Sequence, residues 1–199
     1  MPDLPLKNTD ISSLVAALNF FHPLSEGVID FLKQKVEPVS FRRGELLLKA
    51  GGYCEYVYFI RSGVVRGFVK DNGKILTTWI TAENELVSAI SSLELHTPAL
   101  ESIEALEDCD MLAMHVSSMK ELYEKHPEFN ITGRKLLEKY YRDAERRALI
   151  VRLSNAEQKY RFFIENYSHL ANRIQLKVVA SFLGITLETL SRVRKKLTL

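Results

Sequence analysis

The stretch LKVVASFLGITLETLSRVRKKL, residues 176–197, constrains the fold more than any other part of the chain. Its apolar positions have the spacing of two short helices that pack on each other; they are Val179, Leu183, Ile185, Leu190 and Val193. Ala180 is small where two steeply crossing helices come closest, and Gly184 can take the positive φ of a tight turn. Thr186 can then cap the second helix. The stretch predicts a helix-turn-helix, because an unspecific helical hairpin does not need both Ala180 and Gly184.

The second helix of this motif carries a predicted DNA-reading surface. In such motifs the N-terminal part of the helix meets base edges in the major groove. Arg192 can donate to guanine and Glu188 can accept from cytosine N4, whereas lysines bind phosphate and add affinity without specificity. The predicted DNA-binding residues are Thr186, Leu187, Glu188, Thr189, Ser191, Arg192, Lys195, Lys196 and Lys177. Basic residues are also favourable at a helix C-terminus for electrostatic reasons alone, and both explanations can hold.

The charges divide the chain into two parts. Residues 1–126 carry 12 Lys and Arg against 18 Asp and Glu, and residues 127–199 carry 15 against 7. This asymmetry indicates two modules, one of which faces a polyanion, although a solvated basic helix face gives the same pattern. Two cysteines without CxxC spacing indicate a reducing compartment, and the sequence shows neither a signal peptide nor a membrane span. We expect a cytoplasmic protein.

The middle of the chain predicts a β-structure. Residues 11–36 have helical periodicity that breaks at His22-Pro23, with Ser25 as an N-cap for the second part. Short β-rich runs bounded by glycines follow from Pro38, and VKDNGKI predicts a hairpin. We expect an α+β protein with an N-terminal antiparallel β-roll (a double-stranded β-helix or jelly roll) over residues 1–126, flanked by helices.

Residues 127–153 predict a long helix with an apolar stripe, followed by a helix-turn-helix domain over 154–199. The stripe consists of Leu137, Tyr140, Tyr141, Ala144, Ala148 and Val151. An isolated helix of this length needs a partner, which is either the roll of the same chain or the same helix of a second subunit. The second is favoured, and it predicts a homodimer.

LGITLETLSRVRKKL resembles the recognition motif of the catabolite-activator (Crp/Fnr) family of bacterial transcription regulators, and RRGELLLKAGGYCEYVYFIRSGVVRGFVKDNGK resembles its cyclic-nucleotide-binding roll. The resemblance implies a homodimer joined through the long helix, an effector pocket in the roll and double-stranded DNA as partner, with RNA polymerase left open. Glu188 and Arg192 match base-contacting residues of the family, whereas Leu187 stands where relatives often have an arginine. Because relatives often add a β wing after the recognition helix, a short or absent wing is expected here.

The predicted effector pocket departs from the family pattern. Cyclic-nucleotide binders of this family have a Gly-Glu-Leu-Gly turn and an Arg-Ser pair, whose Glu holds the ribose and whose Arg neutralises the phosphate. The matching residues here are Ser88, Ala89, Ile90 and Ser91 for the turn, followed by Ser92, and Ala99 and Leu100 for the pair. A buried phosphate without a cationic partner is costly, so the roll is expected not to bind cAMP in the family manner. The serines either bind another small effector or cap a local turn.

The same residues argue against several other functions. An iron–sulfur cluster would need about four cysteines, and nothing fixes the candidate haem ligands Pro2, His22, His96 and His115. A cupin-like enzyme would need a tight His cluster with a carboxylate, which this sequence lacks, so no enzyme, metal or cofactor is expected. The alternative to a DNA-binding regulator is a small-ligand sensor that acts through protein contacts.

Overall fold

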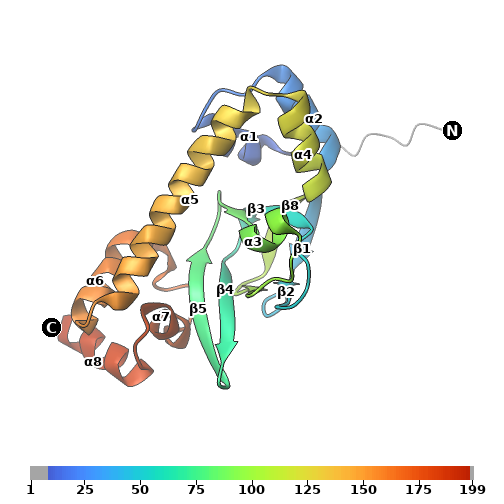
Figure 1. Ribbon diagram of the computed structural model, residues 1–199. Coiled ribbons are helices and arrows are strands. Elements are labelled where there is room, and N and C mark those ends of the chain that lie inside the picture. The colour runs from blue at the N-terminus through green and yellow to red at the C-terminus, as the bar shows by residue number, and fades with distance from the viewer. Residues whose placement is uncertain (1–8, 198–199) are drawn as a thin grey trace.

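The computed structural model describes residues 9–197. A β-roll lies in the middle, a cap of helices covers one end of it, and a long helix runs from that cap to a helical head at the other end (Figure 1). The cap begins with α1 (Ser12–Asn19) and α2 (Glu26–Lys35). The Ser25 hydroxyl accepts the Val28 N–H at 3.3 Å, so the predicted break and N-cap are confirmed.

The roll consists of two four-stranded sheets. Its strands are β1 (Val36–Phe41), β2 (Leu46–Leu48), β3 (Tyr56–Ser62), β4 (Val65–Asp71), β5 (Lys74–Thr81), β6 (Leu86–Val87), β7 (Ser102–Ala105) and β8 (Cys109–His115). The sheet orders are β1-β8-β3-β6 and β2-β7-β4-β5, and every pairing is antiparallel. Buried apolar residues of both sheets, such as Ile60, Ile103 and Met111, fill the space between them. The predicted antiparallel roll is therefore confirmed.

The VKDNGKI segment forms the hairpin that joins β4 to β5. Asn72 and Gly73 take φ values of 47° and 78°, which is the positive φ that a tight two-residue hairpin turn requires. Lys70 pairs with Ile75 and Asp71 with Lys74 in the register that this turn fixes. The hairpin is the longest projection of the roll and points away from the cap (Figure 1).

Helices α3, α4 and α5 lie between β6 and the helical head. The short α3 (Ile90–Leu95), which the sequence did not predict, lies between β6 and β7, and α4 (Val116–Lys125) completes the cap. The long helix is α5 (Phe129–Arg152). Gly133 does not interrupt it: a Cβ there would lie 2.4 Å from the Tyr123 hydroxyl, so this glycine lets α4 pack closely against α5.

The head consists of α6 (Ala156–Tyr167), a 3-10 turn η1 (Ser168–Leu170), α7 (Leu176–Leu183) and α8 (Leu187–Leu197). The Asn155 side chain caps α6 by accepting from the N–H groups of Glu157 and Gln158. Roll residues Val64, Ile80 and Ala82 share one core cluster with the head, so packing continues across the predicted domain boundary.

Two expectations fall partly outside the described residues. The N-terminal segment, for which no signal peptide is predicted, includes residues 1–8, and the wing expectation concerns the chain beyond α8, which includes residues 198 and 199. Within residues 9–197, no helix combines the length and the apolar character that crossing a bilayer requires.

Candidate nucleic-acid interface

The turn between α7 and α8 has the geometry that the sequence predicts. Gly184 ends α7 at a φ of 62°, a left-handed conformation that glycine adopts without a Cβ penalty. The Ile185 N–H donates to the Ala180 carbonyl at 3.0 Å and closes the helix end. Ala180 is buried at the crossing, and Leu190 of α8 is fully buried against the same core. These contacts hold the two helices of a helix-turn-helix at a fixed angle.

Thr186 caps α8. Its hydroxyl accepts the Thr189 N–H at 3.1 Å and lies 3.0 Å from the Thr189 hydroxyl. Both hydroxyls therefore have partners within the helix start, and Thr189 is half-buried. Thr186 and Thr189, both predicted to bind DNA, therefore help to fix the start of α8.

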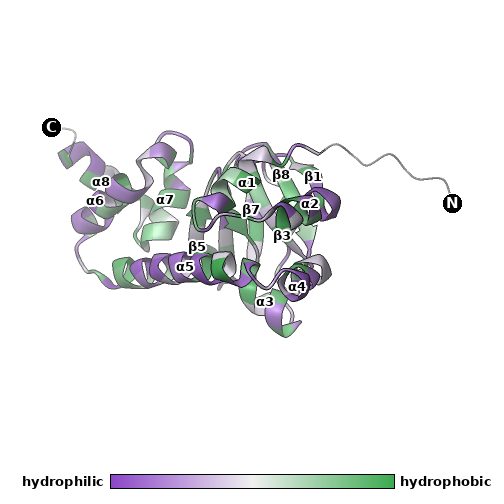
Figure 2. Cartoon of the chain, turned by 90° about the horizontal axis from the view of Figure 1, so that it is seen from above, coloured by the Kyte–Doolittle hydropathy of each residue, from purple (hydrophilic) through white to green (hydrophobic). Residues whose placement is uncertain are grey.

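The exposed face of α8 carries the predicted reading residues. Leu187, Glu188, Ser191, Arg192 and Lys195 are all exposed, because the opposite side of α8 packs on α6 and α7. The Glu188 N–H, the Thr186 hydroxyl and the nearby Arg192 guanidinium lower the pKa of the Glu188 carboxyl, which keeps it ionised as an acceptor. Hydrophilic residues cover much of α8, whereas α7 is largely apolar (Figure 2). The face thus combines a carboxylate, a guanidinium and a hydroxyl within two helical turns.

The predicted phosphate-binding lysines differ in their surroundings. Lys177 and Lys195 are exposed and form no ion pair with any residue in 9–197, whereas Lys196 lies 2.8 Å from the Glu157 carboxylate of α6. Glu157 also pairs with Arg161. No sequence signal links residues 157 and 196, because the contact depends on how α6 and α8 pack.

The seven residues predicted for the effector pocket differ in their exposure. Ala89, Ser92 and Ala99 are buried in the roll, and the Ser92 hydroxyl accepts the N–H of Cys54, a residue 38 positions away, at 2.9 Å. Ser91 and Leu100 are exposed. Only Ser88 and Ile90 line the main cavity. A single pocket formed by these residues stays a prediction; α3 begins after Ala89, so the residues lie on both sides of a helix start.

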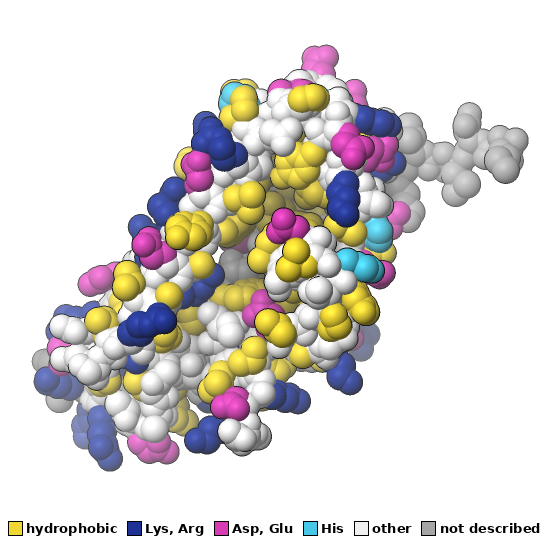
Figure 3. Space-filling model, in the orientation of Figure 1, with side chains coloured by type: hydrophobic (Ala, Val, Ile, Leu, Met, Phe, Trp, Pro, Cys, Tyr) yellow, Lys and Arg dark blue, Asp and Glu magenta, His cyan; other side chains and the backbone are white. Residues whose placement is uncertain are grey.

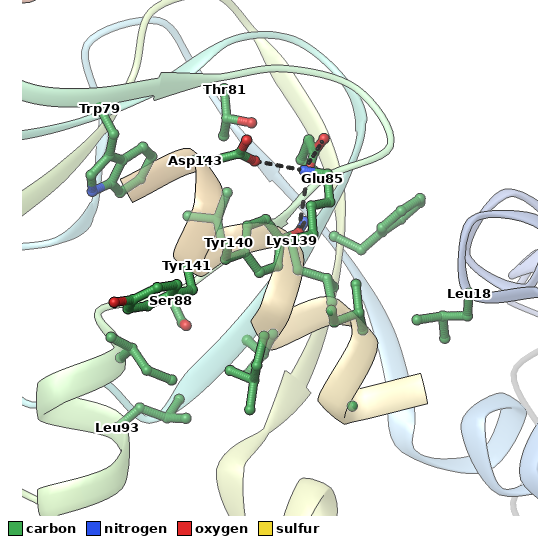
Figure 4. A pocket seen from close by; sticks show the side chains of 18 of the residues that line it. Leu18, Trp79, Thr81, Glu85, Ser88, Leu93, Lys139, Tyr140, Tyr141 and Asp143 are labelled. Atoms are coloured by element: carbon green, nitrogen blue, oxygen red, sulfur yellow. Dashed lines mark hydrogen bonds and ion pairs between the residues drawn. The ribbon is translucent and has the colours of Figure 1, made fainter. Parts of the chain in front are cut away.

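The main cavity lies between the roll and α5 and has a volume of about 1600 Å³. It opens on the face shown in Figure 3. The Lys139 ammonium lies 2.8 Å from the Glu85 carboxylate and 3.2 Å from Asp143, and the Tyr140 hydroxyl donates to Glu85 at 3.0 Å (Figure 4). On the roll side, the Trp79 indole N–H donates to the Glu101 carboxylate at 3.0 Å. Sequence reasoning named Tyr140 only as part of the α5 stripe and missed the other residues, because nothing in the sequence places α5 against β5 and β6.

The apolar stripe on α5 is exposed apart from Tyr140. Leu137, Tyr141, Ala144, Ala148 and Val151 recur at spacings of four and three residues and are exposed. Tyr140 is half-buried against the roll. Its hydroxyl, which donates to Glu85, also accepts the Leu86 N–H at 2.9 Å. Burial raises the pKa of Tyr140, and the neighbouring Glu85 raises it further. Tyr140 therefore joins α5 to its own roll instead of extending the exposed stripe.

Cys54 and Cys109 are buried and unpaired. No group of three metal-ligating side chains occurs among the residues that the structure describes. Burial raises the pKa of the Cys109 thiol to about 11, so this thiol stays protonated.

Comparison with known proteins identifies the kind of molecule. Residues 38–126 match the family described as the cyclic nucleotide-binding domain. The chain is 25% identical over 164 residues to the transcriptional activator protein Anr of Pseudomonas protegens, covering 76% of this chain and 66% of that one. It is 26% identical over 177 residues to the fumarate and nitrate reduction regulatory protein of Yersinia pestis, covering 83% and 69%. The chain is homologous to the Crp/Fnr regulators.

The solved structures agree on the fold of this Crp/Fnr homologue. FixK2 from Bradyrhizobium japonicum superposes with a TM-score of 0.70 at 23% identity, covering 82% of this chain and 84% of that one. The chain spans about two thirds of the length of the curated Pseudomonas relative that it matches. These homologues are transcription regulators and not enzymes, which confirms the expectation drawn from the missing catalytic motifs.

Proposed function

We propose that this chain is a homodimeric, sequence-specific DNA-binding transcriptional regulator. The observation that carries the proposal is the exposed face of α8, where Glu188, Ser191 and Arg192 project from a capped helix held by a glycine turn. A helix of this kind fits the major groove, and its first turns reach base edges. The regulatory homologues named above support the same interpretation.

The exposed stripe on α5 supports a dimer. A 4-3 spacing of exposed apolar residues is the pattern of a two-stranded coiled-coil seam, and α5 is 24 residues long. Two copies joined at this seam would present two α8 helices to an inverted repeat, as dimeric helix-turn-helix proteins do. The seam residues are those of the α5 stripe without Tyr140.

The cavity supports an effector other than cAMP. Ala89 and Ala99 occupy the positions of the family's ribose-binding Glu and phosphate-binding Arg, and both are buried. Glu101 lines the roll side of the cavity, where its carboxylate would repel a cyclic phosphate, whereas the arginines that line the cavity, Arg134, Arg146 and Arg147, lie on α5. A small effector bound between the roll and α5 would contact both Trp79 and Tyr141, and so would couple the roll to the dimer seam.

The second candidate is a small-ligand sensor that acts through protein contacts, and the cavity is the observation that favours it.

Affinity selection of the purified protein on random DNA duplexes, with and without cAMP and across a salt series, separates the two candidate functions. An inverted repeat enriched equally with and without cAMP supports the proposal. Enrichment only with cAMP would contradict the interpretation of Ala89 and Ala99, and no bound DNA at any salt concentration would favour the sensor.

A further inference from the structure

We propose that the β4–β5 hairpin of the roll is a second DNA contact, which binds the phosphate backbone beside the duplex segment that α8 reads. The proposal rests on the proposed DNA-binding function. The roll would then contribute to affinity directly, in addition to holding an effector.

The head is attached to the hairpin strand itself. β5 is the edge strand of its sheet, so part of its backbone has no strand partner. The Ser181 hydroxyl of α7 makes two hydrogen bonds to this free edge: it accepts the Thr77 N–H at 2.9 Å and donates to the Ile75 carbonyl at 2.8 Å. The helix-turn-helix therefore lies on the edge of the strand that leads to the hairpin tip.

The head is attached to the roll at a second place, just before α7. The Arg173 guanidinium, just before α7, lies 2.7 Å from the Glu83 carboxylate and 2.7 Å from Glu107. Together with the core cluster that includes Val64 and Val178, this joins the head and the roll along a continuous interface. The hairpin tip and α8 consequently have a defined relative position in this structure.

The tip has the chemistry of a phosphate contact. Lys70 and Lys74 are exposed and form no ion pair with any residue in the described range 9–197. Asp71 accepts the Asn72 side-chain amide at 3.2 Å, and the five residues 70–74 carry a net charge of +1. Paired residues share a face of the ribbon, so the two lysines lie on opposite faces and flank the tip. Flexible lysines on either side of a narrow tip can reach one backbone that crosses it.

The position of the tip matches the position of the reading helix. Figure 1 shows the β4–β5 hairpin extending past α7 to the same edge of the molecule as α8. In the same orientation, Lys and Arg side chains occur along this lower edge, over α8 and at the hairpin (Figure 3). A duplex that follows the exposed side of α8 would pass the tip on one flank. Because the proposed contact is made by Lys70 and Lys74 to phosphates and not to base edges, it adds affinity without sequence preference.

The test compares two double variants in a fluorescence-anisotropy titration of full-length protein on a selected duplex, across a salt series. Lys70→Ala with Lys74→Ala removes the hairpin charges, and Lys33→Ala with Lys120→Ala removes two charges from the exposed faces of α2 and α4 at the other end of the molecule. We expect the hairpin variant to lower the slope of log affinity against log salt by about one to two units. The control variant should bind as the wild type does.

Further measurements distinguish a failure of this inference from a failure of the proposed function. Preference for the selected site over a scrambled site should be unchanged in the hairpin variant, and trimming the flanking base pairs should remove the difference between this variant and the wild type. An unchanged salt slope in the hairpin variant, while the wild type binds DNA, would overturn this inference alone. A wild type that binds no duplex would overturn the proposed function as well. A loss of site preference in the hairpin variant would mean that the tip contacts something other than the phosphate backbone of the DNA.

Discussion

At the residue scale, Glu188 and Arg192 form the centre of the reading surface. They are one helical turn apart on α8, and the guanidinium helps to keep the carboxyl ionised. One is an acceptor and the other a donor, so they can distinguish cytosine from guanine in the major groove. Leu187 beside them offers only an apolar contact, such as with a thymine methyl group.

Replacing Arg192 separates specificity from affinity. We expect Arg192→Ala to lose about 1–3 kcal/mol of binding to the selected site, with a smaller loss on unrelated DNA, because a bidentate base contact disappears. Lys195→Ala is the matched control and should weaken binding to all duplexes similarly. Competition titrations with cognate and scrambled duplexes measure both effects. An unchanged site preference in Arg192→Ala would contradict the assignment of α8 as the reading helix.

The ion pair between Glu157 and Lys196 restrains one of the predicted phosphate ligands. Glu157→Gln should free Lys196 and strengthen binding to every duplex at low salt, with a steeper salt dependence. Both side chains are at the surface, so the effect should vanish at high salt. Glu165→Gln, an exposed glutamate of the same helix, is the control. Equal salt slopes for Glu157→Gln and the wild type would mean that Lys196 does not face DNA.

At the element scale, the turn of the helix-turn-helix depends on one backbone conformation. Gly184→Ala should destabilise the fold by about 1 kcal/mol, because φ is 62° and a Cβ costs energy there. Crowding adds little, since the nearest atom to a Cβ at this position would be the Lys159 ammonium nitrogen at 3.8 Å. Gly184→Asn should cost less, because asparagine tolerates this region. Urea unfolding compares the three proteins, and equal losses for both substitutions would contradict a purely conformational cause.

The elements that could be predicted from the sequence are those fixed by local chemistry. Gly184, the Asn72-Gly73 turn and the Ser25 cap each act within a few residues, and all three occur as the sequence indicates. The cavity could not be predicted, because it depends on Tyr140 of α5 reaching Leu86 across the roll. The short α3, which begins one residue after Ala89, could not be predicted either, and the single effector pocket around it stays a prediction.

At the scale of the whole molecule, Arg173 links the head to the roll through two carboxylates. Its hydrogen bonds lower the pKa of Glu83 to about 2. A carboxyl with a lowered pKa stabilises the fold above its ordinary value of 4.5, and this contribution is lost as the pH falls toward about 2. The junction should therefore hold at neutral pH and open in acid.

Arg173→Ala tests this junction. It should lower the free energy of unfolding at pH 7 by about 1–2 kcal/mol, a figure reduced for screening because the three side chains are about 30% exposed. It should also flatten the dependence of that free energy on pH between 4.5 and 2, because the pKa of Glu83 returns toward its ordinary value. Urea unfolding across a pH series measures both, with Arg134→Ala, from an exposed pair on α5, as control. An unchanged pH dependence would place the acid sensitivity elsewhere.

The proposed dimer makes the last prediction at this scale. Leu137→Asp places a charge in the α5 seam, where two copies would bring it against its symmetry mate in an apolar contact. We expect this variant to sediment as a monomer at micromolar concentration and to lose binding to an inverted repeat, because a single head lacks the second half-site. Leu149→Asp introduces the same charge on the same helix, about 120° around the axis from Leu137, and should remain dimeric. The opposite result would be a Leu149 variant that dissociates and a Leu137 variant that stays dimeric. It would place the dimer seam on the other side of α5, and the exposed stripe would then serve the cavity and not the dimer.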